Sequence, residues 1–178
     1  DLNSNAGSAR LSASMHGKNL RGTVITPGFN IGEVLANPDF GKVVAKIAVD
    51  GSTDLTRISA KGDIFSFFYK GYTYKNIHVD GLLQHDAFNG EIAINDPNGK
   101  LEVSGKASNI SAFINKKGVL SANININADN VNLHKLQLSD ALGDRDISFN
   151  SQINGHYSSV DNLNGTLQVS SFFMKGEG

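Results

Sequence analysis

The histidines are the side chains of this sequence best suited to bind a metal ion or to transfer a proton near neutral pH. They lie far apart along the chain, at His16, His78, His85, His134 and His156. None of them shows the His-x-His or Glu-x-x-His spacing that brings two ligands to one metal ion. We therefore interpret them as surface or cross-strand residues, and the sequence predicts no metal and no cofactor.

Two carboxylates flank an arginine in the run Asp144-Arg145-Asp146, and their oxygens are of the kind that bind calcium. No glutamate follows at a useful interval, so a solvated loop is the better interpretation. The chain also lacks cysteine, a Gly-x-Ser-x-Gly elbow, a phosphate-binding glycine loop and a dinucleotide fingerprint. We therefore predict that the protein is not an enzyme.

A group of aromatic side chains is the remaining candidate for binding chemistry. Its members are Phe65, Phe67, Phe68, Tyr69, Tyr72 and Tyr74. Such rings can stack on a sugar or a peptide, although aromatics on neighbouring strands more often pack against each other. Packing within the protein is the favoured interpretation.

Composition excludes several classes of partner. The 178 residues include 39% apolar residues and carry a net charge of -1, with 16 basic and 17 acidic residues. This balance gives no electrostatic basis for binding nucleic acid. The apolar runs are far shorter than the roughly 20 residues of a membrane-spanning helix.

The first residues lack a methionine and a signal-type stretch, so we expect a piece of a longer protein, forming one domain over 1–178.

Alternation of apolar and polar residues is the main structural signal, and it is clearest over 88–107. Phe88, Ile92 and Ile94 share one side of an extended chain, because successive side chains of a strand point to opposite faces. The run Asp96-Pro97-Asn98-Gly99 is typical of a turn. Apolar residues resume on the same side after it, which predicts a hairpin with one apolar face.

The same alternation predicts strands over most of the chain. They cover 11–16, 20–24, 43–49, 55–62, 64–69, 72–83, 119–128, 147–153 and 163–169. Asn30, with Glu33 three residues later, predicts a short helix over about 30–37 that ends before Pro38. The mixed apolar spacing of 130–138 allows one helical turn, and 139–145 is predicted to be a loop.

A weak repeat of an apolar residue, Asp or Asn, and then Gly accompanies these strands. Its copies are Val49-Asp50-Gly51, Val79-Asp80-Gly81, Phe88-Asn89-Gly90, Ile153-Asn154-Gly155 and Leu163-Asn164-Gly165. A single copy is most simply a turn, whereas glycine within a strand marks a bulge or a close backbone approach. The number of copies beside strands favours a repeatedly curved sheet.

Several of these motifs follow one another in a characteristic order. They are Phe40-Gly41-Lys42-Val43, Tyr69-Lys70-Gly71-Tyr72, Tyr74-Lys75-Asn76-Ile77, Val79-Asp80-Gly81, and Phe88-Asn89-Gly90 through Asp96-Pro97-Asn98. On these motifs the stretch from about 29 to 108 resembles the TamB branch of the AsmA-like proteins, in its Bacteroidetes-type form. Beyond it, the similarity consists of alternating strands.

The resemblance implies an all-β fold, in which an elongated, curved antiparallel sheet forms a half-pipe (β-taco) with an apolar concave face and one or two short helices. It also implies a periplasmic protein, anchored to the inner membrane by a segment outside this chain. Such proteins are expected to carry phospholipid acyl chains towards the outer membrane. They are also expected to assist outer-membrane protein assembly with an Omp85-type barrel, which the full-length protein would contact.

On this interpretation the groove that binds lipid is lined by the inward apolar residues of the strands. They are Val43, Ala45, Ile47, Val49, Ile77, Val79, Phe88, Ile92, Ile94, Leu101, Val103, Leu120, Ile124, Ile126, Ile147, Phe149, Ile153, Leu167 and Val169. Acyl chains suit such a groove because each buried methylene contributes about 0.8 kcal/mol.

The sequence leaves two alternatives to the lipid-binding groove. The first is a two-layer β-sandwich that recognises a glycan or a peptide through the aromatic group, since its strands would alternate in the same way. The second is a structural scaffold whose sheet edge captures another strand by β-augmentation. The exposure of the apolar face distinguishes the first alternative from the groove.

Overall fold

The computed structural model describes residues 2–4, 6–54, 56–114, 118–159 and 162–176. Its strands are β1 (Leu2–Ser4), β2 (Gly7–His16), β3 (Asn19–Asn30), β4 (Phe40–Ser52), β5 (Arg57–Tyr69), β6 (Tyr72–Gln84), β7 (Ala87–Asp96), β8 (Gly99–Ser108), β9 (Leu120–Asn132), β10 (Asp146–Ser159) and β11 (Asn162–Lys175). Two short helices, α1 (Ile31–Leu35) and α2 (Ile110–Ile114), accompany them.

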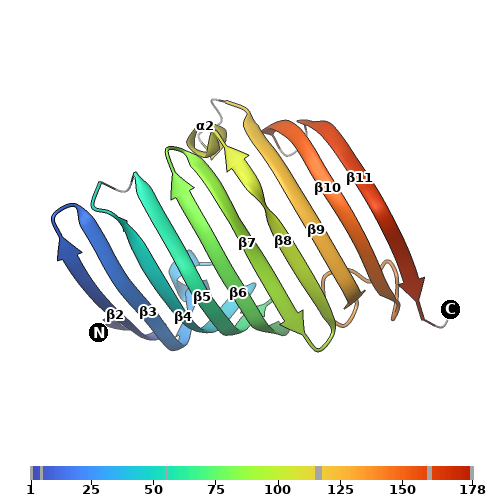
Figure 1. Cartoon of the computed structure of the whole chain (residues 1–178). Coiled ribbons are helices and arrows are strands. Elements are labelled where there is room, and N and C mark those ends of the chain that lie inside the picture. Colours follow the sequence, from blue (N-terminus) through green and yellow to red (C-terminus); the bar gives the residue numbers. More distant parts are fainter. Residues whose placement is uncertain (1, 5, 55, 115–117, 160–161, 177–178) are drawn as a thin grey trace.

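All described strands belong to one 11-stranded sheet, in the order in which they occur along the chain. Each strand pairs antiparallel with its neighbours in sequence, so the sheet is a continuous meander (Figure 1). The first and last strands lie at opposite sides of the sheet, which is open. The predicted all-β fold, a curved antiparallel sheet in the form of a half-pipe with short helices, is confirmed.

The two ends of the strands carry different connections. At the lower end in Figure 1 lie α1, the turn between β5 and β6, and the long connection of residues 133–145 between β9 and β10. At the upper end lie α2 and the turn between β6 and β7. We use "lower end" and "upper end" in this sense below.

Strand β5 differs from the expectation of two separate stretches, because it runs unbroken through Gly62. Gly62 pairs with Ile47 on one side and with Val79 on the other. A Cβ atom at Gly62 would lie 2.2 Å from the carbonyl oxygen of Lys46. The glycine therefore permits a close approach of two strands and does not interrupt the strand.

The repeated glycines also lie within strands and not in turns. Gly81 pairs with Gly90, and Gly155 pairs with Gly165. A Cβ atom at Gly90 would lie 2.8 Å from the Cα atom of Gly81. The interpretation of single copies as turns is therefore wrong, and the glycines mark close contacts between strands.

The predicted helix is present as α1, somewhat shorter than expected. The Asn30 side chain caps it by accepting a hydrogen bond from the backbone N–H of Gly32 at 3.1 Å, and it donates to Glu33 Oε1 at 3.3 Å. Helix α2 was not expected at this position; its first turn is held by a residue distant in sequence, since the Ser111 N–H donates to Asp86 Oδ1 at 2.7 Å. The allowed turn in 130–138 is one hydrogen-bonded turn, from Leu136 N–H to Asn132 C=O at 3.1 Å.

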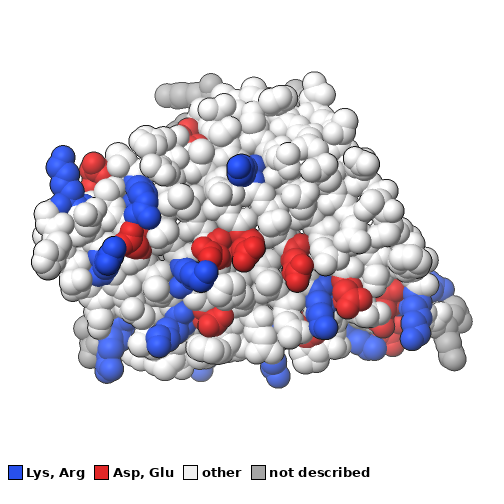
Figure 2. All heavy atoms as spheres, viewed as in Figure 1, with Lys and Arg blue, Asp and Glu red and all other residues white. Residues whose placement is uncertain are grey.

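The two faces of the sheet differ in composition. The face seen in Figure 2 carries charged side chains in cross-strand pairs. Two cross-strand pairs are Arg21 with Asp50, bonded at 2.7 Å, and Lys61 with Asp80, bonded at 2.5 Å. These pairs are exposed and contribute little stability, but they keep this face solvated. The opposite face is the apolar one.

None of the helices in the described part of the chain has the length and apolar character needed to cross a membrane.

Candidate functional site

The pairing register places all the predicted groove residues on one face of the sheet. Val79 pairs with Ile92, Ile92 with Val103, and Val103 with Ile126. Ile124 pairs with Ile153, which pairs in turn with Leu167. Paired residues project to the same side of a sheet, so these ladders join the strands from β6 to β11 into one apolar face.

Strands β2 to β5 continue the same face. Val49 pairs with Ala60, and Ile47 pairs with Val24, which pairs in turn with Leu11. Several residues of this face were missed as groove residues, although the same alternation contains them. They are Leu11, Met15, Leu20, Val24, Ile58, Ile64, Leu83, Phe172 and Met174.

At the lower end the connection of residues 133–145 covers the apolar face. Leu136 is buried in a cluster with Ile77 and Ile147, and Leu133 and Leu142 pack against that cluster. The cluster draws residues from every strand from β5 to β10. Ile77 and Ile147 therefore lie in a closed core, together with the half-buried Ile94, Leu101 and Phe149 that surround it.

Tyr74 ties this connection to the sheet. Its hydroxyl donates a hydrogen bond to the carbonyl oxygen of Leu136 at 2.9 Å, and the contact is buried. Burial raises the pKa of the Tyr74 phenol above its ordinary value, so the hydroxyl remains a donor at neutral pH. The connection also reaches the turn between β5 and β6, where a Cβ atom at Gly71 would lie 2.4 Å from Gln137 Oε1.

Polar contacts hold the two ends of the connection together. Asn132, which is almost completely buried, donates through Nδ2 to Asp144 at 2.8 Å and to Asp146 at 2.9 Å. Lys135 bonds Asp144 at 2.9 Å. The Lys135 ammonium, followed by the Asn132 amide, lowers the pKa of Asp144. The candidate calcium ligands Asp144 and Asp146 thus accept hydrogen bonds that close the connection.

The predicted aromatic group lies mostly at this closed end. Tyr72 and Tyr74 meet edge to face at 4.9 Å between ring centroids, and Phe67 stacks on Tyr69 at 6.2 Å. All four belong to the cluster or pack against it, whereas Phe65 is exposed. The preference for packing within the protein is confirmed for these four rings.

Towards the upper end the apolar face is open. Ile92 is 42% exposed and Phe88 is 38% exposed, although both point to the face that is buried further down. A hollow of about 460 Å³ lies here, lined on its apolar side by Ile58, Leu83, Phe88, Ile92 and Ile110 of α2. On β11, Leu167 is 66% exposed and Val169 is 50% exposed. The open part of the face is therefore apolar and accessible.

The remaining predicted groove residues are buried or half-buried. Ala45 is buried. Those that are half-buried are Val43, Ile47, Val49, Val79, Val103, Leu120, Ile124, Ile126 and Ile153.

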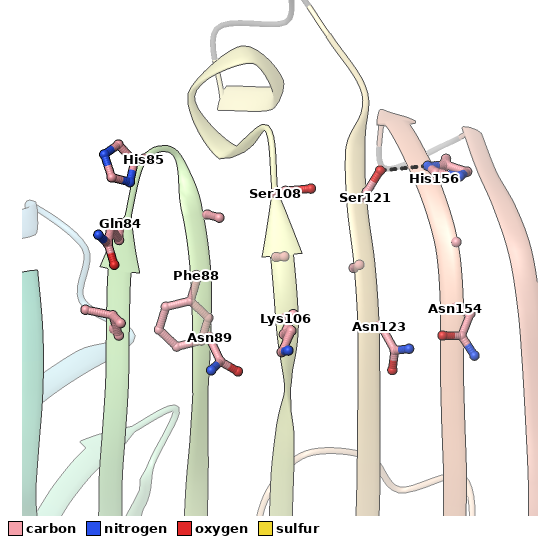
Figure 3. A pocket seen from close by; sticks show the side chains of 15 residues that line it. Gln84, His85, Phe88, Asn89, Lys106, Ser108, Ser121, Asn123, Asn154 and His156 are labelled. Carbon is pink, nitrogen blue, oxygen red and sulfur yellow. Dashed lines mark hydrogen bonds between the residues drawn. The ribbon is translucent and has the colours of Figure 1, made fainter. Parts of the chain in front are cut away.

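The opposite, polar face has a hollow of its own at the upper end, of about 800 Å³ (Figure 3). Asn89, Lys106, Asn123 and Asn154 form a row across β7 to β10, since each pairs with the next. Above this row the Ser121 hydroxyl and His156 Nδ1 are hydrogen-bonded at 2.8 Å. The polar side chains that line this hollow are amides, hydroxyls, two histidines and Lys106, with no carboxylate among them. The hollow can therefore donate and accept hydrogen bonds.

The histidines remain apart from one another. His78 bonds Asp63 at 2.8 Å, and His134 bonds Asp140 at 2.7 Å. Within the described ranges, no group of three or more His, Cys, Asp or Glu side chains is arranged to hold a metal ion.

Comparisons with known proteins identify no relative of this chain. Searches with this chain found no matching protein-family model, no similar curated protein and no similar solved structure.

Proposed function

We propose that this chain is a segment of a periplasmic bridge of the TamB/AsmA-like type, whose apolar face shelters phospholipid acyl chains on their way to the outer membrane. The observation that carries the proposal is the uncovered apolar face of the upper part of the sheet. In a water-soluble domain such a continuous apolar surface marks a binding site. The proposal also includes an inner-membrane anchor and an Omp85-type barrel partner, both supplied through the longer protein.

Acyl chains fit this surface for a physical reason. The open face carries aliphatic side chains together with aromatic rings such as Phe88, and it has no charged side chain at the ladder positions that join Ile92, Val103 and Ile126. Each methylene transferred from water to this face contributes about 0.8 kcal/mol. A face without specific polar contacts gives an acyl chain similar free energies at neighbouring positions, which favours movement along it.

The single sheet argues against the alternative of a two-layer β-sandwich. The described strands all belong to one sheet, so among them no second sheet covers the apolar face. Four of the six aromatic rings that would have recognised a glycan or a peptide are packed at the closed lower end. Lipid binding therefore uses the apolar face that the sheet leaves exposed. The β-sandwich alternative instead requires exposed aromatic rings, most of which this fold buries.

The test compares two neighbouring residues of β9 that face opposite sides. Ile124 is half-buried on the apolar face, and Asn125 is exposed on the polar face. We expect Ile124→Asp to weaken binding of a fluorescent fatty acid by about tenfold or more, because a carboxylate on the apolar face must stay hydrated. Asn125→Asp adds the same charge and should leave the affinity within about twofold, since surface changes away from a site have small effects.

Circular dichroism establishes that each variant is folded before the titration. Absence of saturable binding by the folded wild type, to both the fatty acid and a short-chain phospholipid below its micellar concentration, would overturn the proposal. Equal losses in both variants would show that charge, and not the apolar face, controls binding.

A further inference from the structure

The polar face of the sheet has a charged part and an uncharged part. Figure 2 shows charged side chains over the left and lower parts of this face, whereas its upper right part carries none. In β9 and β10 the sole carboxylates, Asp129 and Asp146, lie towards the lower end. A face that serves hydration alone usually mixes charges of both signs throughout. The uncharged part is therefore suited to a more specific task.

Two cross-strand rows of polar side chains form the uncharged part. The upper row is the one shown in Figure 3, and it consists of Asn89, Lys106, Asn123 and Asn154. The lower row lies two residues further along each strand, and it consists of Ser104, Asn125, Gln152 and Gln168. Amides and hydroxyls make up both rows, apart from the single ammonium group of Lys106.

The two rows line adjoining hollows. The hollow of about 800 Å³ at the upper end shares Asn89, Lys106 and Asn123 with a second hollow of about 630 Å³. This second hollow shares Ser104 and Asn125 with a third one, of about 350 Å³. The three hollows together can hold an elongated ligand.

The amides of the upper row are available to a ligand. Within the described ranges, the side-chain amides of Asn89, Asn123 and Asn154 make no hydrogen bond to the protein. Further down the same face, by contrast, the Asn127 amide donates to Glu102 at 3.4 Å. A side-chain amide offers two N–H donors and a carbonyl acceptor. The upper row therefore presents unused donors and acceptors side by side.

We propose that the upper and lower rows bind an extended, uncharged oligosaccharide whose chain runs across β7 to β10. Sugar hydroxyls both donate and accept hydrogen bonds, as the amides do. Neighbouring strands lie about 4.8 Å apart, which is close to the length of one pyranose unit in an extended chain. Each strand of the upper row can therefore offer one polar side chain to one sugar unit.

The surroundings of the rows favour a sugar over other polar ligands. Leu82 and Ala87 line the upper hollow and can contact the C–H face of a sugar ring. Lys106 alone cannot balance the repeated phosphates of a nucleic acid. A peptide could not extend the sheet here, because β7 to β10 are each paired on both sides. The site lies on the face opposite the proposed lipid surface and does not depend on it.

The test is an NMR titration of the whole chain with three tetrasaccharides. Cellotetraose and chitotetraose are extended and β-1,4-linked, whereas maltotetraose has the same length and a curved, α-1,4-linked chain. We expect at least one of the extended probes to shift the side-chain NH₂ signals of Asn123 and Asn154 saturably. Maltotetraose should bind about fivefold more weakly or worse, because a curved chain misses some of the hydrogen bonds.

A variant pair locates the site. Asn123→Ala removes one amide from the upper row and should weaken binding by about threefold to tenfold, the effect of one hydrogen bond. Asn95 is the matched control, since it is an exposed amide on the same face near the lower end and outside the three hollows. Asn95→Ala should leave the affinity within about twofold. Circular dichroism establishes that both variants are folded.

Three results would overturn the inference. The first is no saturable shift with either extended tetrasaccharide in the folded wild type, and the second is an equal loss of affinity in the two variants. The third is equal binding of maltotetraose, which would show that the spacing of the strands is not recognised. Fatty-acid binding should persist in both variants, so a failure here is distinguishable from a failure of the lipid proposal.

Discussion

The lower and upper ends of the apolar face carry similar side chains but differ in what covers them. At the lower end, Leu136 and its neighbours in the 133–145 connection fold over Ile77 and Ile147 and bury them. At the upper end, Ile92 and Phe88 lie on the same face and remain accessible. An apolar alternation in a sheet therefore specifies a face, whereas the connections decide whether that face becomes core or binding surface.

The closed end also explains how a single sheet is stable. A sheet with one apolar face gains stability when that face is buried against another layer. Here a connection without regular strands supplies the layer over part of the face, and the cluster that it completes spans six strands, β5 to β10. The same strands continue upward from this core, and their pairing supports the upper part of the sheet. The apolar residues there are therefore not needed for packing and can bind a ligand.

The strongest test of this comparison is to remove one leucine from each end. Leu136→Ala should lower the free energy of unfolding by about 2–5 kcal/mol, because it leaves a cavity in the buried cluster. Leu167→Ala in the open part should change it by less than about 0.5 kcal/mol, since that side chain is largely exposed. Urea denaturation of both variants measures the difference. Equal effects would show that the two ends do not differ in burial.

A second test removes the bond between the connection and the sheet. Tyr74→Phe deletes the hydroxyl that donates to the Leu136 carbonyl and should cost about 0.5–1.5 kcal/mol, because that buried acceptor loses its partner. Tyr157→Phe is the control, since Tyr157 lies near the opposite end of β10 from the 133–145 connection, where it pairs with Leu120. Hydrogen exchange should show faster opening of 133–145 in Tyr74→Phe alone. An unchanged exchange rate would contradict the role of this bond.

The smallest effect is expected from pH. Lys135 and Asn132 lower the pKa of Asp144 below its ordinary value of 3.8. A carboxyl with a lowered pKa in the folded state contributes stability above its unfolded pKa, and this contribution is lost as the pH falls through the lowered folded pKa. Asp144→Asn should therefore flatten the decline in stability of the closed end below about pH 4.

Denaturation of wild type and Asp144→Asn between neutral pH and acid measures this change. The effect should be small because Asp144 is largely exposed to solvent. Parallel pH profiles for the two proteins would show that the ion pair with Lys135 does not close the connection.

The strands and their shared face could be predicted because alternation is a local property of the sequence. Phe88, Ile92 and Ile94 occupy alternate positions along one strand, and a period of two assigns each residue to a face without knowledge of its partners. Asn30 and Glu33 likewise revealed the start of α1, since a cap involves residues within one turn. The glycines were ambiguous because a turn and a close contact use the same residue type.

The closed end could not be predicted because it depends on contacts between distant parts of the chain. The spacing of Leu133 and Leu136 indicates one helical turn and does not reveal its partners, and the surface on which the connection packs is formed by strands β5 to β10. The burial of Ile77 and the exposure of Ile92 follow from where this connection lies. Their own alternation is the same, so no local pattern separates the two.

The order of the strands has a consequence for how such a molecule forms and evolves. Every described strand pairs with its immediate neighbours in sequence, so most pairings have short loops to close. Folding can therefore propagate from one hairpin to the next as the polypeptide emerges from the ribosome. For the same reason, duplication or loss of a hairpin changes the length of the sheet without rewiring the strands that remain.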